Sequence, residues 1–457
     1  MNRKQPTEKT TLLLLSDTHT LTPQPPTTTS SSPSSSSHSH DHESSTPPPA
    51  FLDPLPAADI LIHAGDLTKV SRRHEHLTTL SYLKAHPARL KLVIPGNHDI
   101  TFDAPYYESL GHHRHRNRTD HTAPSATASA ANISSGKAEP GHVEDPDAIR
   151  RLYTGPEAWD AGIRLLGEGV HEFEVPGPDG KKTRRLTVYA SSWTPEFCQW
   201  AFGYERGVDR FNPPASASAS SASSSSPGTA EGRRKEEEDG DGVDGNPAIG
   251  TRTEEHHHHH HHHHTHGHAH NHHHQEPQPN ESTAAATRER PRTHGSTGSR
   301  GEGARGAIAA NSGRGGFVAP APIPDGQAID IVITHGPPYG ILDHVGPDHV
   351  SVGCEHLYRA VRRARPRLHV FGHIHEGYGA MRREWSTGND SIIQCDQPRT
   401  REEHCARVDV SRASMMPLNP GQETLFVNAS VVNVQYHPIN APWLVEMELP
   451  VVVGEGN

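Results

Sequence analysis

Five short apolar runs, each followed by Asp, Asn or His, constrain this chain more than any other feature of its sequence. The runs are TLLLLS, DILIHA, KLVIP, IDIVIT and LHVF, and their length and composition predict buried strands. The residues that follow them are Asp17-Thr18-His19, Gly65-Asp66, Gly96-Asn97-His98-Asp99, His335 and Gly372-His373-Ile374-His375. Because ligands of open α/β sheets bind at the carboxyl ends of the strands, these polar residues predict one shared site.

The rest of the periodic sequence predicts a layered α/β fold. Expected strands cover Thr11–Ser16, Asp59–His63, Leu90–Pro95, Arg185–Ser191, Ile329–His335, Leu368–Gly372, Leu425–Ala429 and Trp443–Leu449. Helical patterns fall at about 71–86 and 353–365. Strands alternating with helices first, and then strands with shorter connections, are typical of sheets layered with helices.

Low-complexity sequence interrupts this pattern. Only 32% of the 457 residues are hydrophobic, and Gly and Pro number 40 each. Three stretches, 20–56, 109–145 and 213–321, are too poor in apolar residues to offset their ordering entropy, so we expect long disordered insertions there. A fourth polar stretch, 386–422, is predicted as a further insertion. The remainder, 9–19, 57–108, 146–212 and 322–450, is expected to form one domain.

Charge, hydropathy and cysteine content exclude several classes of protein. The formal net charge of −11 argues against a specific nucleic-acid partner bound through bulk positive charge. No apolar run reaches the length of a membrane span or of a signal-peptide core, so we expect no membrane association. The four cysteines lack C-x-x-C spacing, which favours free thiols in a reducing, cytoplasmic location. The oligomeric state is not fixed by these features.

The polar residues at the strand ends have the chemistry of a two-metal site. Asp17 and His19 are two residues apart, so an extended backbone directs both to one side, and His373 and His375 share that spacing. Asp66 follows a glycine and is placed to bridge two cations, and Asn97 offers a neutral oxygen. This N/O donor set without thiolate suits two divalent ions of Mn, Fe, Zn, Co or Ni.

The order of these motifs resembles the calcineurin-like metallophosphoesterase superfamily. Further segments narrow the resemblance to its small metallophosphoesterase-domain-containing branch. These segments are Ser192-Trp193-Thr194-Pro195, His335-Gly336-Pro337-Pro338-Tyr339-Gly340, Phe371-Gly372-His373-Ile374-His375-Glu376-Gly377-Tyr378-Gly379 and Asn428-Ala429-Ser430. The resemblance covers nearly all of the expected domain and none of the insertions.

The resemblance implies a sandwich of two mixed β-sheets flanked by helices, with two metal ions, Mn being the first choice. One ion would take Asp17, His19, Asp66 and His375, and the other Asp66, Asn97, His335 and His373. It also implies in-line attack of metal-bound hydroxide on phosphorus without a covalent enzyme intermediate. His98 would be the catalytic proton donor, or would stabilise charge on the phosphate. Asp99 would shape the turn or act directly.

Several aromatic residues are candidates for the rim of the site. Trp193, Phe197, Trp200 and Phe202 follow an expected strand, where they would either pack in the core or offer a stacking face for a base. Tyr339 and Tyr378 follow ligand-bearing turns. We take Trp193, Tyr339 and Tyr378 as the candidate substrate contacts.

The sequence therefore predicts a metallophosphoesterase that hydrolyses small phosphodiesters or phosphomonoesters such as nucleotides. Two alternatives stay open. One is a phosphoprotein phosphatase with the same fold. The other is a vestigial fold with a metal-buffering role for the tract from His256 to His274, which holds 15 histidines.

Overall fold

The computed structural model describes six stretches of the chain, and every statement below concerns them. They are 6–26, 47–115, 143–177, 182–214, 319–325 and 327–452. All belong to one compact unit, Met1–Ala219 with Arg314–Asn457. Most of each of the three predicted low-complexity insertions lies outside the described residues.

The first sheet has six described strands in the order β15-β17-β1-β2-β3-β4. They are β1 Thr7–Leu15, β2 Ile60–His63, β3 Leu90–Val93, β4 Ile163–Leu165, β15 Ala406–Asp409 and β17 Trp443–Pro450. β1 to β4 run parallel, whereas β17 pairs antiparallel with β1, Leu13 opposite Leu444. The carboxyl ends of β1, β2 and β3 therefore lie at the same edge.

The second sheet has seven described strands in the order β14-β13-β16-β12-β9-β6-β5. They are β5 Gly169–Pro176, β6 Thr183–Ser191, β9 Ile331–Thr334, β12 Leu368–Phe371, β13 Gly379–Glu384, β14 Asp390–Ile392 and β16 Glu423–Asn428. Its four central strands, β6, β9, β12 and β16, are parallel, and the flanking strands are antiparallel. Both sheets are thus mixed, as predicted.

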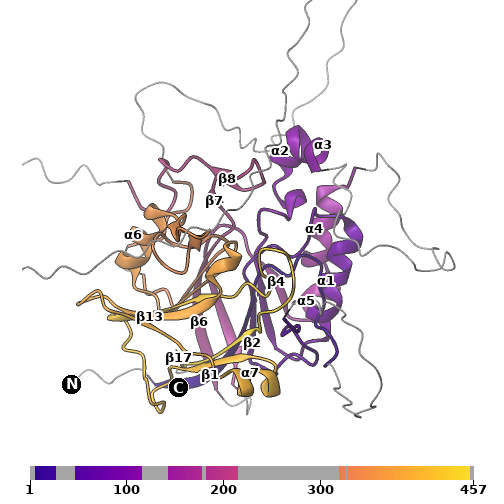
Figure 1. Cartoon of the computed structure of the whole chain (residues 1–457). Helices are drawn as coiled ribbons and strands as arrows, with labels where there is room; N and C mark the ends of the chain where they lie inside the picture. Colours follow the sequence, from indigo (N-terminus) through magenta and orange to yellow (C-terminus); the bar gives the residue numbers. More distant parts are fainter. Residues whose placement is uncertain are drawn as a thin grey trace, which may run out of the picture. The chain divides into compact units, whose positions relative to one another are not determined.

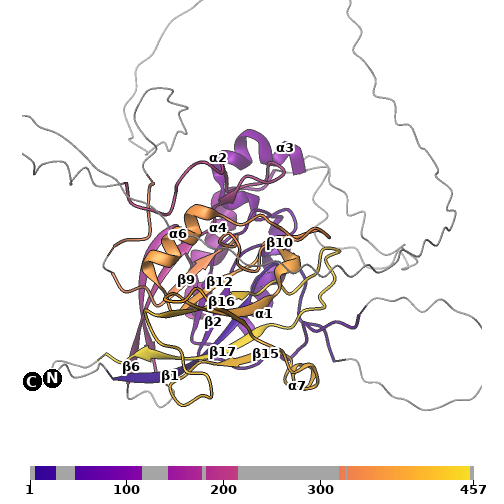
Figure 2. The same cartoon turned by 60° about the vertical axis from the view of Figure 1, so that its left-hand side comes forward.

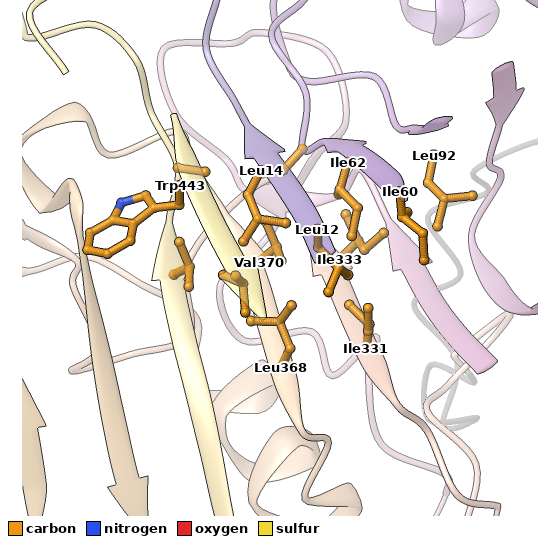
Figure 3. Close-up of a cluster of buried hydrophobic side chains, with 14 of the residues drawn as sticks. Leu12, Leu14, Ile60, Ile62, Leu92, Ile331, Ile333, Leu368, Val370 and Trp443 are labelled. Carbon is orange, nitrogen blue, oxygen red and sulfur yellow. The ribbon is translucent and has the colours of Figure 1, made fainter. Parts of the chain in front are cut away.

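The main hydrophobic core lies between the two sheets. Figure 3 shows side chains of β1, β2 and β3 meeting those of β9 and β12, with Trp443 of β17 beside them. Leu12 and Leu14 alternate with Leu13 and Leu15, which face the other side of the first sheet. The run Leu12–Leu15 is apolar at every position because both faces of the sheet are buried there.

Helices cover the outer face of each sheet (Figures 1 and 2). α1 Arg73–Ala85, α4 Pro146–Thr154 and α5 Pro156–Asp160 pack on the first sheet, and α6 Glu355–Ala364 packs on the second. α4 begins where Asp145 accepts hydrogen bonds from the backbone of Asp147 and Ala148. The predicted sandwich of two mixed sheets flanked by helices is confirmed.

The shorter elements lie in the connections between strands and helices. They are η1 Ile100–Phe102, α2 Ala104–Tyr106, the π-helix η2 Tyr107–Gly111, α3 His112–His115, η3 His375–Gly377, α7 Gln397–Glu403, β7 Thr194–Pro195, β8 Gly203–Tyr204, β10 His344–Val345 and β11 Val350–Ser351.

The structure adds detail to the predicted insertions. The polar stretch 386–422 contributes β14 to the edge of one sheet and β15 to the edge of the other. At the ends of the first low-complexity stretch, Gln24 and Leu52 form a β-bridge, and Phe51 is fully buried. The second stretch begins in helix, because η2 and α3 extend to His115. These segments belong to the packed domain although their sequence is polar.

Two expectations from composition can be compared with the described residues. The four cysteines, Cys198, Cys354, Cys395 and Cys405, are all free thiols, as predicted. Within the described segments, helices with the length and hydropathy needed to span a bilayer are absent.

Candidate metal centre

The seven predicted ligands converge from the two sheets onto one place. The turns after β1, β2 and β3 deliver Asp17, His19, Asp66 and Asn97 from the first sheet, and the turns after β9 and β12 deliver His335, His373 and His375 from the second. Among the described residues, three overlapping groups could hold a metal ion. They are Asp17, His19 and His375; His19, Asp66 and His98; and Asp66, His335 and His373.

The first group gathers around His19 and His375. Their Nε2 atoms are 3.4 Å apart. Nε2 of His375 lies 3.5 Å from Oδ1 of Asp17, and Nε2 of His19 lies 3.6 Å from Oδ2 of Asp66. Metal–ligand bonds of about 2.0–2.2 Å place neighbouring ligand atoms roughly 3.0–3.5 Å apart, so the spacing fits a cation shared by these side chains.

The group of Asp66, His335 and His373 gathers around His335, and Asn97 joins it. Nε2 of His335 lies 3.3 Å from Oδ1 of Asp66 and 2.8 Å from Oδ1 of Asn97, and the His335 ring centroid lies 5.0 Å from that of His373. The two carboxylate oxygens of Asp66 thus turn to different groups, Oδ2 to His19 and Oδ1 to His335. This is the arrangement expected of a carboxylate that bridges two cations.

The imidazoles present the nitrogens that a metal needs. His335 donates its Nδ1–H to the carbonyl oxygen of Ala64 at 3.0 Å, and His375 donates its Nδ1–H to that of Asn433 at 3.1 Å, which leaves Nε2 for the site. Burial lowers the pKa of His19 and of His373 to about 3, so both are neutral at pH 7. A neutral imidazole is the form that binds a cation.

Two buried carboxylates favour the binding of positive charge at the centre. Asp17 is fully buried and Asp66 is 2% exposed, and their ion-pair partners in the described part of the chain are histidines. Burial opposes charge on His335, yet Asp66 and Asp17 raise its pKa to about 9. Among the described residues, the buried Nδ1 of His19 finds no hydrogen-bond partner. Buried anionic oxygens beside neutral imidazoles and an unsatisfied ring nitrogen fit divalent cations.

The backbone of the centre is held in an uncommon conformation. Asp17, His19, Asp66 and His373 have positive φ values of 55°, 42°, 53° and 66°. Residues other than glycine adopt this region at a cost of order 1–3 kcal/mol, and such residues cluster at functional sites. The motif glycines allow the close approach of the turns, because a Cβ on Gly372 would lie 2.0 Å from Oδ2 of Asp17.

Asp99 ties two of the ligand turns together. Its carboxylate accepts hydrogen bonds from the backbone N–H groups of Leu67, Thr68 and Gly96 at 2.8 to 3.0 Å, and from the Thr68 hydroxyl at 2.6 Å. Of the two roles considered for Asp99, the structure supports the shaping of the turn.

His98 lies beside the ligands with one ring nitrogen occupied. Its backbone N–H donates to Oδ1 of Asp66 at 2.8 Å, and its Nδ1–H donates to the carbonyl oxygen of Lys69 at 2.8 Å. A ring nitrogen of His98 is within 4.8 Å of ligand atoms of His19 and Asp66. Burial lowers the pKa of His98, whereas the charge of Asp66 raises it. The ring is therefore placed to act at Nε2.

The three predicted substrate contacts are placed differently from one another. Trp193 is half-buried, with the Arg210 guanidinium 4.0 Å from its ring. Tyr339 is 44% exposed. Within the described segments, its ring makes no ring contact with a predicted ligand. Tyr378 packs against the core, and its hydroxyl donates to the Ala441 carbonyl at 2.7 Å. The Tyr378 hydroxyl thus has a partner within the core, and its contact with a substrate stays a prediction.

Two other aromatic rings contact the ligands instead. Phe197 is 61% exposed, with its ring centroid 6.1 Å from that of His373. Tyr436 is 41% exposed, with its centroid 4.8 Å from His19 and 5.4 Å from His375. Sequence reasoning counted Phe197 among the rim aromatics but missed Tyr436, whose turn has no recognisable signal.

The two sheets that meet at this cluster of carboxylates and imidazoles define a metallophosphoesterase fold. Residues 10–211 match the family model described as calcineurin-like phosphoesterase. Residues 10–211 are therefore similar to calcineurin-like phosphoesterases, and the three candidate groups suit the dinuclear divalent metal centre of such enzymes. The match includes the predicted ligands of the first sheet, and the second sheet supplies the predicted ligands His335, His373 and His375 beyond it.

More particularly, the chain is similar to Metallophosphoesterase domain-containing protein 1 of Homo sapiens and of Mus musculus. Each is 39% identical over 129 residues, which are 28% of this chain and 27% of the relative. It is also 40% identical over 68 residues to UPF0046 protein K07C11.7 of Caenorhabditis elegans, which is 15% of this chain and 21% of the relative. The aligned segments thus span about a quarter of the length of the curated relatives.

Proposed function

We propose that this chain hydrolyses small phosphate esters, with nucleotides among its substrates, at a centre of two divalent ions for which Mn²⁺ is the first candidate. The observation that carries the proposal is the convergence of seven side chains around Asp66, whose two oxygens face separate groups of ligands. Two divalent ions held there would neutralise phosphate charge and generate a nucleophile from water.

The side chains of the centre have separate tasks in this proposal. Asp17, His19, Asp66 and His375 would hold one ion, and Asp66, Asn97, His335 and His373 the other. His98 would serve the leaving oxygen. Because the carbonyl oxygen of Lys69 holds its Nδ1 proton, Nε2 donates only when the ring carries both protons. The negative charge of a bound ester favours that form.

A screen of the purified chain tests this function. With excess Mn²⁺, we expect turnover of some members of a panel of cyclic and linear phosphodiesters, nucleoside monophosphates and phosphopeptides, together with about two tightly held ions per chain. Turnover of the phosphopeptides alone would favour the phosphoprotein phosphatase. Many weakly held ions and no turnover would favour metal buffering by the histidine-rich tract.

The exposed aromatic rings support substrates that carry an aromatic group. Phe197 contacts the ring of one ligand, and Tyr436 contacts the rings of two others. Tyr436 has a φ of 63°, and its turn is tied to the centre because the carbonyl oxygen of Asn433 accepts from both Tyr436 N and His375 Nδ1. A strained, exposed aromatic held against metal ligands is a candidate stacking surface.

Removal of either ring should weaken the binding of nucleotides more than that of simple esters. Aromatic pairing is worth about 1 kcal/mol, so Phe197→Ala and Tyr436→Ala should each raise KM for a nucleotide about fivefold, with little change for an alkyl phosphate. Trp159→Ala is the matched control, because Trp159 is 58% exposed on α5, outside the site. Equal changes in KM for both kinds of ester would contradict the stacking role.

The histidine-rich tract should be dispensable for hydrolysis. Replacing 215–318 by a short Gly/Ser linker would join Pro214 to Ala319. The two ends come from segments that are close together, because Ile323 N donates to the carbonyl oxygen of Phe211 at 3.0 Å. In excess Mn²⁺ the shortened chain should keep two tight ions and its turnover, and it should lose weak uptake of Ni²⁺ or Zn²⁺. Metal titration and steady-state rates measure both. A folded but inactive shortened chain would show that the tract contributes to the site.

A further inference from the structure

His98 is fixed at two points by hydrogen bonds, but they do not define its plane. The backbone bond to Asp66 and the Nδ1 bond to Lys69 each hold one atom of the residue. The imidazole can still tilt about the Nδ1 bond, and such a tilt moves Nε2. Whatever contacts the flat face of the ring therefore decides where Nε2 points.

That face is covered by Trp200. The two ring centroids are 3.9 Å apart and the rings are inclined by only 23°. On the edge side, the His19 ring meets His98 at 4.7 Å and nearly at a right angle. The indole is thus the flat surface against which the imidazole lies.

Trp200 is itself held from behind by His115. It is 8% exposed, and its second face stacks on His115 with centroids 3.7 Å apart and an inclination of 15°. His115 donates from Nε2 to the Tyr106 hydroxyl at 2.9 Å, and that hydroxyl donates to the carbonyl oxygen of Gln199 at 2.5 Å. Three parallel rings therefore link α3 to the side chain proposed as proton donor.

We propose that Trp200, backed by His115, is a positioning residue that orients the His98 imidazole toward the leaving group. The inference rests on the proposed function, because it concerns the same reaction. It also gives a role to the start of the stretch predicted as the second insertion, since His115 lies within 109–145. Trp200 is not one of the predicted ligands, and in this proposal it acts through His98 and not through the substrate.

The test compares esters with good and poor leaving groups. A displacement of about 1 Å can cost about 10²-fold in rate, so Trp200→Leu should lower kcat for an alkyl ester by roughly 10- to 100-fold. The loss for a 4-nitrophenyl ester should be less than about threefold, because that leaving group needs little protonation. KM and the content of two metal ions should stay unchanged. Trp200→Phe, which keeps a flat ring, should restore most of the rate.

Combination with His98→Ala separates positioning from other effects. If Trp200 acts through His98, Trp200→Leu should cause no further loss in a chain that already carries His98→Ala. Trp385→Leu is the matched control, because Trp385 is also 8% exposed but packs in the core of the second sheet. It should lower thermal stability without changing the dependence on the leaving group.

The outcomes distinguish this inference from the proposed function. Absence of hydrolysis by the unmodified chain would overturn the proposed function and this role with it. An active chain in which Trp200→Leu slows both esters equally, or adds its full loss to that of His98→Ala, would overturn the positioning role alone. If Trp200→Leu does not fold, His115→Ala should show the same selective loss to a smaller degree, and an unchanged alkyl-ester rate there would also overturn the proposal.

Discussion

Asp66→Asn should abolish nearly all hydrolysis and release at least one of the two metal ions while the fold is retained. The substitution keeps the size of the side chain and removes the charge that faces both ligand groups through Oδ1 and Oδ2. Charge stabilisation by a metal ion is worth several kcal/mol, so the rate should fall by more than about 10³-fold. Metal analysis by mass spectrometry and the steady-state rate measure the two effects.

Asp330→Asn is the matched control for this substitution. Asp330 is a buried carboxylate, 6% exposed, that accepts a hydrogen bond from Thr187 N at 2.9 Å and pairs with Arg367. Loss of the Asp330 charge should reduce the free energy of unfolding without releasing metal. A chain with Asp66→Asn that keeps two ions and normal turnover would remove the basis for a bridging carboxylate.

His98→Ala should keep both metal ions and lose about 10²- to 10⁴-fold in rate, the usual contribution of a general acid. The ring donates its Nδ1 proton to Lys69 and is absent from the proposed ligand sets, so its removal leaves those sets complete. The loss should shrink for esters with good leaving groups. Parallel measurement of metal content and of kcat over a series of leaving groups tests both points.

His76→Ala is the control for removal of a buried histidine. His76 lies in α1, where it hydrogen-bonds Ser71 and Tyr153, and it should affect stability rather than chemistry. Loss of a metal ion from the His98→Ala chain would make His98 a ligand, which its position beside His19 and Asp66 also allows.

The centre could be predicted because its residues follow local rules. Each ligand comes within four residues of the end of a buried strand, and parallel strands bring their carboxyl ends to one edge. The seven predicted ligands could therefore be placed together without knowledge of the loop conformations. The sandwich of two sheets could also be predicted, because apolar runs such as Leu12–Leu15 indicate strands that are buried on both faces.

The remainder depends on contacts between distant segments. Tyr378 and Tyr436 are both tyrosines near ligand-bearing or polar turns, yet one donates to Ala441 in the core and the other contacts His19 and His375. No local pattern separates them. β15 could not be predicted from its polar stretch, because an edge strand buries only part of its surface and therefore has a weaker apolar pattern. The stack of His98, Trp200 and His115 joins three segments that are far apart in the sequence or separated by other elements.

The division of the ligands between the sheets has a consequence for biosynthesis. Asp17, His19, Asp66 and Asn97 leave the ribosome early, whereas His335, His373 and His375 follow more than two hundred residues later. Each proposed ion needs donors from both sheets, so a nascent chain that ends before His335 holds neither complete set. The complete donor set of each proposed ion therefore forms only when the second sheet has docked on the first. A bound pair of ions would thus mark a chain whose translation has passed β12.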